Sequence, residues 1–203
     1  MIVMLDSSEA HFKIAAEELG CQVGQLLTPL TRYTDRGLVY GIDNGAFSGF
    51  DARAFRSLLA RQSGDRDRCR FVCAPDVVGS ARRTLEMFDI WYPQLAGWPV
   101  ALVVQDGQEN LPIRWDLISA VFIGGSTEFK ISPDAKAIVD AAKIAEKWTH
   151  MGRVNTPDRF DLALSWGIDS IDGTGISRYS HMRRALSGAR LPFEGHEEDQ
   201  DGR

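Results

Sequence analysis

The feature that most restricts the fold is a repeated pairing of a short apolar run with polar or glycine residues directly after it. Six such places occur along the chain, at residues 42–45, 74–76, 104–107, 123–126, 153–156 and 167–178. Uninterrupted apolar runs are typical of strands that are buried on both faces of a parallel sheet. Because ligands bind outside the carboxyl ends of such strands, the pattern predicts one sheet edge that carries groups capable of chemistry.

Helical spacing of apolar residues fills the intervals between the runs. Strands are expected at 1–5, 21–28, 38–42, 71–74, 98–104, 118–123, 150–154 and 168–171. Helices are expected from a cap at Ser7 or Ser8 to residue 19 and at 51–61, 80–91, 133–147, 157–166 and 179–186, with at most a short helix in 112–117. About eight strands alternating with helical connections predict an α/β fold, a compact single-domain (β/α)8 TIM-type barrel. A doubly wound open sheet is the alternative.

The composition is that of one globular domain. The 203 residues are 44% hydrophobic and 25% charged, which favours a single catalytic domain over residues 1–192. Residues 193–203 are acidic and polar, and are expected to form a disordered tail. No apolar run approaches the ~20 residues of a membrane span, and residues 1–5 are too short for a signal peptide, so a cytoplasmic location is expected.

Three cysteines, Cys21, Cys69 and Cys73, lack the paired spacing with histidine that a zinc site requires. They are expected to be free thiols in a reducing compartment, with Cys69 and Cys73 buried and inert. The sequence therefore predicts no bound metal and no cofactor.

Residues 38–178 resemble the guanine transglycosylase family, whose members exchange guanine in RNA or DNA for a 7-deazaguanine base. The resemblance rests on motifs that occur in the family's order: Asp43-Asn44-Gly45-Ala46-Phe47, Ala74-Pro75-Asp76, Val103-Val104-Gln105, Gly124-Gly125-Ser126, residues 150–157, and residues 167–172. It implies a (β/α)8 barrel and an active site at the carboxyl ends of its strands.

The resemblance also implies a role for each motif. Asp172 would be the nucleophile and Asp43 the general acid and base. The other matching positions would bind the base, namely Phe47, Asp76, Gln105, Gly124, Gly125 and Met151.

These residue types suit the chemistry. A carboxylate can trap the sugar carbon when the glycosidic bond breaks, and a second carboxylate can manage the proton on the base. Asp76 complements the N–H donors of guanine, whereas the Gln105 amide and the Gly125 N–H suit its O6 acceptor. Phe47 and Met151 could pack on the two faces of the ring.

The chain departs from the tRNA-type members in two places. Residues 174–178 replace their Pro-Thr-Arg segment, and their Cys/His zinc site has no counterpart. These differences favour the small DNA-type branch associated with phages and mobile defence islands, with queuine tRNA-ribosyltransferase-like activity on tRNA as the close variant. The incoming 7-deazaguanine, the target sequence and the oligomeric state stay open.

A nucleic acid partner requires local positive charge, because the formal net charge of −5 gives no global attraction. The expected phosphate contacts are the arginines of the last third of the chain, Arg153, Arg178, Arg183, Arg184 and Arg190.

Two other functions fit the same residues. A phosphate-binding barrel acting on a small sugar phosphate would use Gly124-Gly125 and residues 173–175 as anion cups. A non-catalytic, nucleic-acid-associated paralogue would need neither Asp43 nor Asp172, since an aspartate at a strand end is often only a helix cap. His150 is interpreted as a structural histidine and not as a metal ligand.

Overall fold

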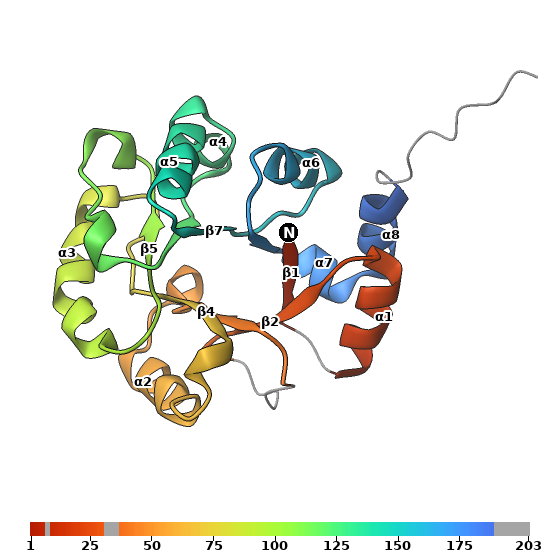
Figure 1. Cartoon of the computed structure of the whole chain (residues 1–203), viewed down its shortest axis with the longest axis horizontal. Helices are drawn as coiled ribbons and strands as arrows, with labels where there is room; N and C mark the ends of the chain where they lie inside the picture. Colours follow the sequence, from red (N-terminus) through yellow and green to blue (C-terminus); the bar gives the residue numbers. More distant parts are fainter. Residues whose placement is uncertain (7–8, 31–36, 189–203) are drawn as a thin grey trace, which may run out of the picture.

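A closed ring of parallel strands forms the centre of the protein in the computed structural model, which describes residues 1–6, 9–30 and 37–188 (Figure 1). The strands are β1 Ile2–Leu5, β2 Val23–Leu27, β3 Tyr40–Ile42, β4 Cys69–Cys73, β5 Val100–Val104, β6 Ala120–Ile123, β7 Trp148–Met151 and β8 Ser170–Asp172. Each strand pairs with its neighbours in chain order, and β1 also pairs with β8, with Val3 opposite Ile171. The predicted (β/α)8 barrel is therefore confirmed, and the open-sheet alternative is wrong.

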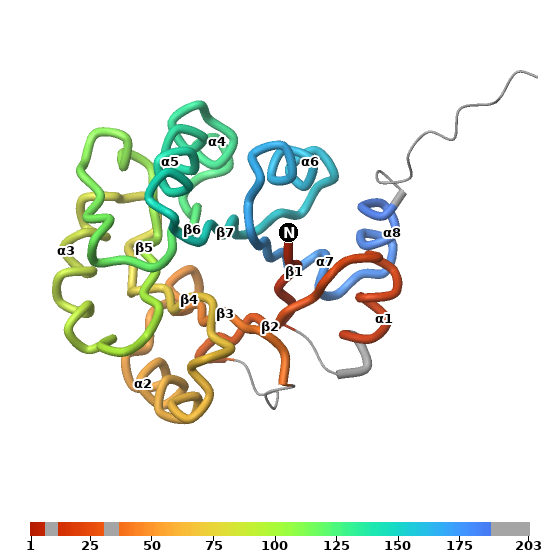
Figure 2. The backbone as a smooth tube through the Cα atoms, viewed as in Figure 1, coloured from red at the N-terminus to blue at the C-terminus, as the bar shows by residue number. Residues whose placement is uncertain are grey.

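Helices surround the ring, as the chain trace in Figure 2 shows. In the described part of the chain they are α1 Glu9–Leu19, α2 Ala52–Arg61, α3 Ala81–Trp91, α4 Thr127–Lys130, α5 Pro133–Ile144, α6 Pro157–Ser165, α7 Thr174–Arg178 and α8 Ser180–Gly188. Short 3-10 turns lie at η1 Ala46–Ser48, η2 Arg66–Arg68, η3 Tyr92–Leu95, η4 Gln108–Asn110 and η5 Trp115–Leu117.

Several helices begin where a side chain satisfies their free backbone N–H groups. Asp51 accepts from the N–H groups of Arg53 and Ala54, and Ser80 accepts from that of Arg83. Ser132 caps α5, which has Pro133 in its first turn, and Thr156 caps α6. The helices expected at 51–61, 80–91 and 133–147 are thus present, each with such a cap at its start.

The boundaries of the last elements differ from those expected. Strand β7 ends at Met151 instead of reaching residue 154, because Arg153 takes a left-handed backbone with φ 57°. Strand β8 begins at Ser170 and not at residue 168. The expected helix 179–186 is preceded by a separate helix α7, and the extended backbone of Tyr179 separates α7 from α8.

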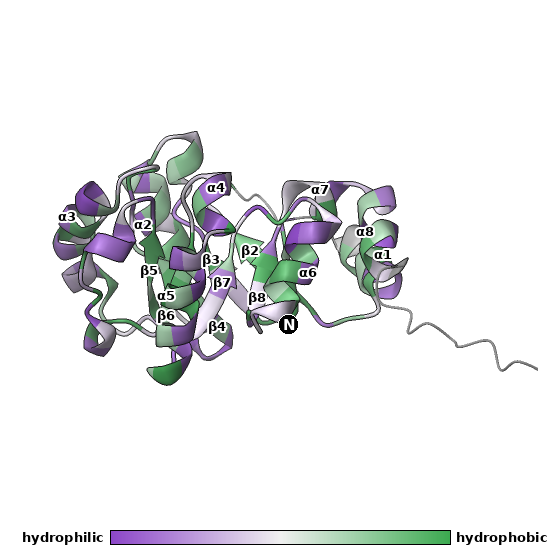
Figure 3. Cartoon of the chain, turned by 90° about the horizontal axis from the view of Figure 1, so that it is seen from above, coloured by the Kyte–Doolittle hydropathy of each residue, from purple (hydrophilic) through white to green (hydrophobic). Residues whose placement is uncertain are grey.

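Alternate residues of each strand face the barrel interior and the surrounding helices. The interior cluster comprises Ile2, Met4, Leu26, Phe71, Cys73, Ala101, Val103, Ala120 and Phe122. The larger outer cluster joins the strands to the helices through residues such as Ile42, Phe55, Phe88 and Ile171. Figure 3 shows strands β2 and β5 in the colour of apolar residues, and helices of mixed hydropathy.

The two ends of the described chain meet on one side of the barrel. Helix α1 packs against α8 (Figure 1). Arg183 of α8 donates through Nε to Oε2 of Glu18 at 2.6 Å, and through Nη1 to the carbonyl of Ile176 at 2.8 Å. The predicted tail at 193–203 and the cap at Ser7 or Ser8 lie outside the described residues, so the domain limit at residue 192 stays a prediction.

Candidate active site

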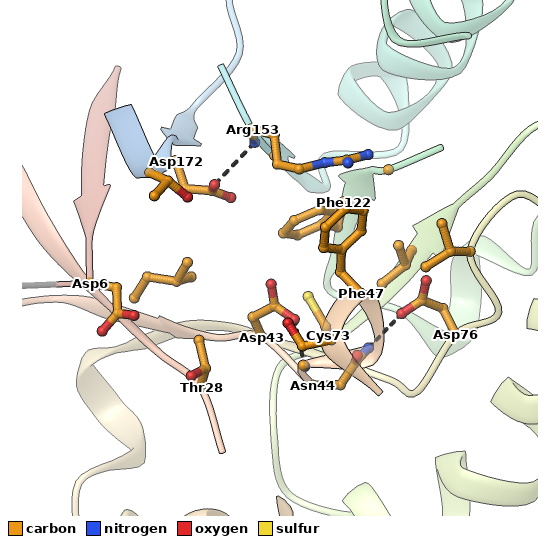
Figure 4. Close-up of a pocket in the computed structure, with 18 of the residues that line it drawn as sticks. Asp6, Thr28, Asp43, Asn44, Phe47, Cys73, Asp76, Phe122, Arg153 and Asp172 are labelled. Carbon is orange, nitrogen blue, oxygen red and sulfur yellow. Dashed lines mark hydrogen bonds between the residues drawn. The ribbon is translucent and has the colours of Figure 1, made fainter. Parts of the chain in front are cut away.

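A pocket of about 620 Å³ opens at the carboxyl ends of the strands (Figure 4). Residues at or shortly after the carboxyl end of every strand line it; from β1 to β8 they are Asp6, Thr28, Asp43, Asp76, Gln105, Gly124, Gly152 and Asp172. Helix α7 adds Thr174, Ser177 and Arg178, and α4 adds Lys130. The pocket therefore lies at the carboxyl edge of the sheet, where the sequence pattern predicted the chemically capable residues.

Asp172 ends strand β8 and points into this pocket with a side chain that is 13% exposed. Its Oδ1 accepts from the backbone N–H of Arg153 at 3.0 Å, and its Oδ2 lies 3.0 Å from Nε2 of His150. These two contacts hold the carboxylate in one orientation. Gly173 follows directly, and a Cβ there would lie 2.4 Å from the carbonyl oxygen of Val154. The turn after Asp172 thus requires glycine.

His150 reaches Asp172 from within the barrel, where its side chain is fully buried. Its Nδ1 lies 2.8 Å from Oγ of Ser170, which in turn accepts from Nε1 of Trp148 at 2.9 Å. The imidazole ring packs against Phe71 and Phe122, each with ring centroids 4.6 Å away. His150 is thus the structural histidine that the sequence suggested, but it also contacts the proposed nucleophile.

Asp43 follows β3 and lies in the same pocket. Its Oδ1 accepts from the N–H of Gly45 at 2.8 Å, in a turn where Gly45 has φ 78°. Burial raises the pKa of Asp43 to about 6, although the hydrogen bond from Gly45 opposes the rise. The negative charges of Asp172 and Asp76 add to it. A carboxyl group with this pKa can both give and take a proton near neutral pH.

Asp76 belongs to a network of amides at the ends of β3, β4 and β5. Asn44 donates to its Oδ1 at 2.8 Å, and Gln105 donates to its Oδ2 at 2.6 Å. Gln105 also accepts from the N–H of Gly79 at 2.9 Å, and Asn44 also donates to the carbonyl of Ala74 at 2.9 Å. Burial raises the pKa of Asp76 although both amides oppose the rise. Asp76 and Gln105 therefore present a rigid edge to the pocket.

Arg153 joins three parts of the pocket. Its backbone holds Asp172, its Nη2 donates to the carbonyl of Gly125 at 2.8 Å, and its guanidinium lies 4.4 Å from the centroid of the Phe47 ring. Its φ of 57° is uncommon for a residue with a Cβ. Such strained conformations cluster at functional sites. Phe47 itself is 68% exposed, so its ring is available at the mouth of the pocket.

Lys130 is a cation in the pocket wall that the sequence interpretation missed. Its side chain is 3% exposed, and its Nζ donates to the carbonyl of Gly152 at 3.0 Å. Burial, followed by the charge of Arg153, lowers the pKa of Lys130 to about 8. Its position seven residues after Ile123, on the short unpredicted helix α4, gave no periodic signal.

Cys73 lines the pocket, where burial disfavours its nucleophilic thiolate form. Burial raises the pKa of this thiol well above its usual value, and the nearby aspartates add to the rise. All three cysteines are free, and burial also raises the pKa of Cys69, to about 12. This agrees with the expectation of buried, inert thiols at positions 69 and 73.

Most of the predicted site residues are brought together. The pocket lining includes Asp43, Phe47, Asp76, Gln105, Gly124, Gly125, Arg153, Asp172 and Arg178. Their chemical roles remain predictions.

Three of the predicted contacts have positions that do not fit their proposed roles. Met151 is 1% exposed and packs in the outer cluster between strands and helices, because its neighbour His150 takes the inward position. Arg183 is 3% exposed and bonded to Glu18, so it cannot reach a phosphate. Arg184 is exposed on α8 and does not line the pocket. Arg190 lies outside the described residues.

No helix in the described ranges has the length and hydropathy to cross a membrane. Within the same ranges, no group of three or more His, Cys, Asp or Glu side chains is placed to hold a metal ion.

Comparison with known proteins adds only general likenesses. No protein-family model and no curated protein matches the sequence. Phosphoribosyl anthranilate isomerase from Thermus thermophilus superposes with a TM-score of 0.48 at 12% identity, over 92% of this chain and 96% of that one. A cube-shaped, porous cage designed by fusing symmetric oligomeric domains gives 0.46 at 13% identity, over 93% and 70%. At these scores neither likeness bears on the activity.

Proposed function

We propose that the protein is a base-exchange glycosyltransferase that replaces guanine in a polynucleotide, DNA in preference to tRNA, with a 7-deazaguanine base. The observation that carries the proposal is the pair of carboxylates, Asp43 and Asp172, which enter one pocket from different strands. Their surroundings suit two different tasks. The ordered motifs that resemble guanine transglycosylases give the pair its chemical interpretation.

In the first half of the reaction, Asp172 attacks C1′ of the target nucleotide. The C1′–N9 bond breaks, its electron pair goes to the departing guanine, and a covalent aspartyl–sugar bond forms. Asp43 in its acid form donates a proton to the guanine. Its pKa of about 6 keeps a usable share of the acid near neutral pH.

In the second half, the carboxylate of Asp43 takes the N9 proton of the incoming 7-deazaguanine. The base nitrogen then attacks C1′, the aspartyl–sugar bond breaks, and its electron pair returns to Asp172. The proton released from Asp43 in the first half is thus recovered in the second, so the cycle needs no external acid or base.

The rigid edge formed by Asp76 and Gln105 supports recognition of the base. A carboxylate accepts from the N1–H and N2–H₂ groups of guanine, and Gln105 holds Asp76 in place for this contact. Of the two side chains expected to stack on the base, only Phe47 lines the pocket, since Met151 does not reach it. We assign one exposed face of the Phe47 ring to stacking on a base.

Arg178, exposed at the end of α7, is the remaining candidate for a phosphate contact, together with Arg153. A cytoplasmic setting belongs to the same proposal, and the three free thiols support it.

One observation favours the alternative of a small sugar phosphate. Lys130, Arg153 and Arg178 line the pocket close to the glycines at positions 124, 125 and 173, which could form an anion cup. This alternative requires no attack by Asp172.

The test separates the two functions. The protein is incubated with DNA, or separately with tRNA, that carries labelled guanine, and a 7-deazaguanine is added. Label should be released by the wild type, and Asp172→Asn should lower the rate by orders of magnitude and form no adduct on a denaturing gel.

Asp161→Asn is the matched control, because Asp161 is exposed on the outer helix α6. It should behave as the wild type. Near-normal exchange by Asp172→Asn would contradict the assignment of Asp172 as the nucleophile. Absence of exchange on both polynucleotides would contradict the proposed function.

A further inference from the structure

A chain of polar side chains crosses the otherwise apolar interior of the barrel and ends at Asp172. It begins with Trp148 at the start of β7, continues through Ser170 and His150, and has separations of 2.9, 2.8 and 3.0 Å. Ser170 and His150 are fully buried. Polar groups in such a place are costly unless their hydrogen bonds are complete.

The hydrogen-bonding capacity of each group sets the direction of this chain. The indole of Trp148 can only donate, so it occupies one lone pair of the Ser170 hydroxyl oxygen. The hydroxyl proton of Ser170 is then available for donation, and Nδ1 of His150 is the buried acceptor within its reach. Nε2 of His150 then carries the ring proton and faces the Oδ2 atom of Asp172. All four groups are satisfied, with every donor directed toward the carboxylate.

The ring has no freedom to leave this arrangement. Phe71 and Phe122 contact it at centroid distances of 4.6 Å, and no part of it is exposed to solvent. Rotation of the imidazole by 180° would place carbon atoms against both Ser170 and Asp172, so the Ser170 hydroxyl proton and Oδ2 of Asp172 would both lose their hydrogen bonds to the ring. The aromatic contacts therefore fix the plane, and the polar contacts fix the orientation.

From these contacts we infer that His150 is a positioning residue for the proposed nucleophile, and that Ser170 and Trp148 set its tautomer. This inference rests on the proposed function. The N–H of His150 fixes one oxygen of Asp172 and stabilises its negative charge, while the backbone N–H of Arg153 fixes the other. The carboxylate is thereby held ready for attack on the sugar without its own rearrangement.

The first test needs no substrate. The protein contains four histidines, and nitrogen-15 NMR of labelled imidazoles distinguishes the two ring nitrogens of each. His150, assigned by its loss in His150→Gln, should show a proton bonded to Nε2 and an acceptor-type Nδ1. A proton on Nδ1 alone, or on both nitrogens, would overturn the proposed direction of the chain.

The second test uses catalysis. His150→Leu removes the donor, whereas His150→Gln retains an N–H near the position of Nε2. Loss of a hydrogen bond to a charged group should slow adduct formation by His150→Leu about tenfold to a hundredfold, and His150→Gln should recover most of that rate. The dissociation constant for free guanine should be unchanged in both, because His150 does not line the pocket.

A cycle with Ser170→Ala tests the path through His150. If His150→Leu folds poorly, Ser170→Ala alone still decides, since an adduct rate equal to that of the wild type would contradict the inference. Ser170→Ala should slow adduct formation less than His150→Leu, and the double variant should be no slower than His150→Leu alone, because Ser170 acts only through His150. Additive losses, or equal adduct rates in the wild type and His150→Leu, would contradict the inference. If the wild type exchanges no base at all, the proposed function fails, and the NMR result still decides the direction of the hydrogen bonds.

Discussion

Asp43 and Asp172 differ in what surrounds them, and this difference supports the two separate tasks proposed for them. Asp172 receives donors on both oxygens, from His150 and from the backbone of Arg153. Asp43 receives one backbone N–H, from Gly45, and is affected most by burial. Pairs of acidic groups whose surroundings diverge in this way are typical of acid–base and nucleophile pairs.

The raised pKa of Asp43 predicts a stability cost at neutral pH. Its pKa is about 6 in the folded protein, against 3.8 ordinarily. The folded state therefore binds more protons than the unfolded state between these values, and stability falls as pH rises from about 4 to about 6. Asp43→Asn removes the charge, so it should raise the free energy of unfolding at pH 7.5 by roughly 1–3 kcal/mol while base exchange is lost.

Urea unfolding at pH 7.5 and at pH 4.5 measures this effect. The gain from Asp43→Asn should be much smaller at pH 4.5, because the acid form of Asp43 is then neutral as well. Asp161→Asn, on the surface of α6, should show no gain at either pH. A gain for Asp43→Asn that is the same at both values would contradict the role of charge.

The residues that the sequence located share one property, which is their place directly after an apolar run. Asp43, Asp76, Gln105 and Asp172 were found in this way, and the barrel brings them to one pocket. His150 could have been placed by the alternation of β7, which turns it inward and Met151 outward. Lys130 lies on a helix of four residues and had no such signal.

At the scale of elements, close packing between strands limits which residues the interior accepts. Gly41 of β3 lies so close to Phe71 of β4 that a Cβ at Gly41 would come within 2.2 Å of the ring. The same ring contacts His150. A large side chain beside a glycine thus fills this layer of the barrel and supports the polar chain behind Asp172.

Gly41→Ala is therefore expected to destabilise the protein by about 1–3 kcal/mol, because Phe71 must move in a closely packed interior. Urea unfolding would measure the loss. Gly64→Ala is the matched control, since no atom lies within 4 Å of the added methyl group there. Equal effects of the two substitutions would show that the loss comes from glycine replacement in general and not from the contact with Phe71.

The order of strands and helices could be predicted because apolar runs and helix caps are local signals. The end of β7 could not, because the left-handed backbone of Arg153 beyond it goes with hydrogen bonds to Asp172 and Gly125. Those contacts join residues that are far apart in the sequence. Local periodicity therefore predicts that an element exists, while its last residues depend on tertiary contacts.

At the scale of the whole molecule, closure of the barrel depends on its first and last elements. Strand β1 pairs with β8, and α1 packs against α8. Arg183 supports this junction through Glu18 and the carbonyl of Ile176. Hydrogen bonds from Ser180 and then Arg183 lower the pKa of Glu18, so the ionised form of Glu18 is the one that holds α1 to α8.

Arg183→Ala therefore tests a structural role against the phosphate contact expected from the sequence. Removing one partner of a largely buried ion pair should lower the free energy of unfolding by roughly 2–4 kcal/mol. Arg184→Ala, next to it but exposed, should change stability by about 0.5 kcal/mol or less. Denaturant unfolding and the salt dependence of DNA binding should be measured on both variants. If Arg183 contacted a phosphate, Arg183→Ala would reduce the salt dependence and leave stability unchanged. Because Arg183 is enclosed between α1 and α7, we expect the reverse: a loss of stability, with an unchanged salt dependence in the fraction that remains folded.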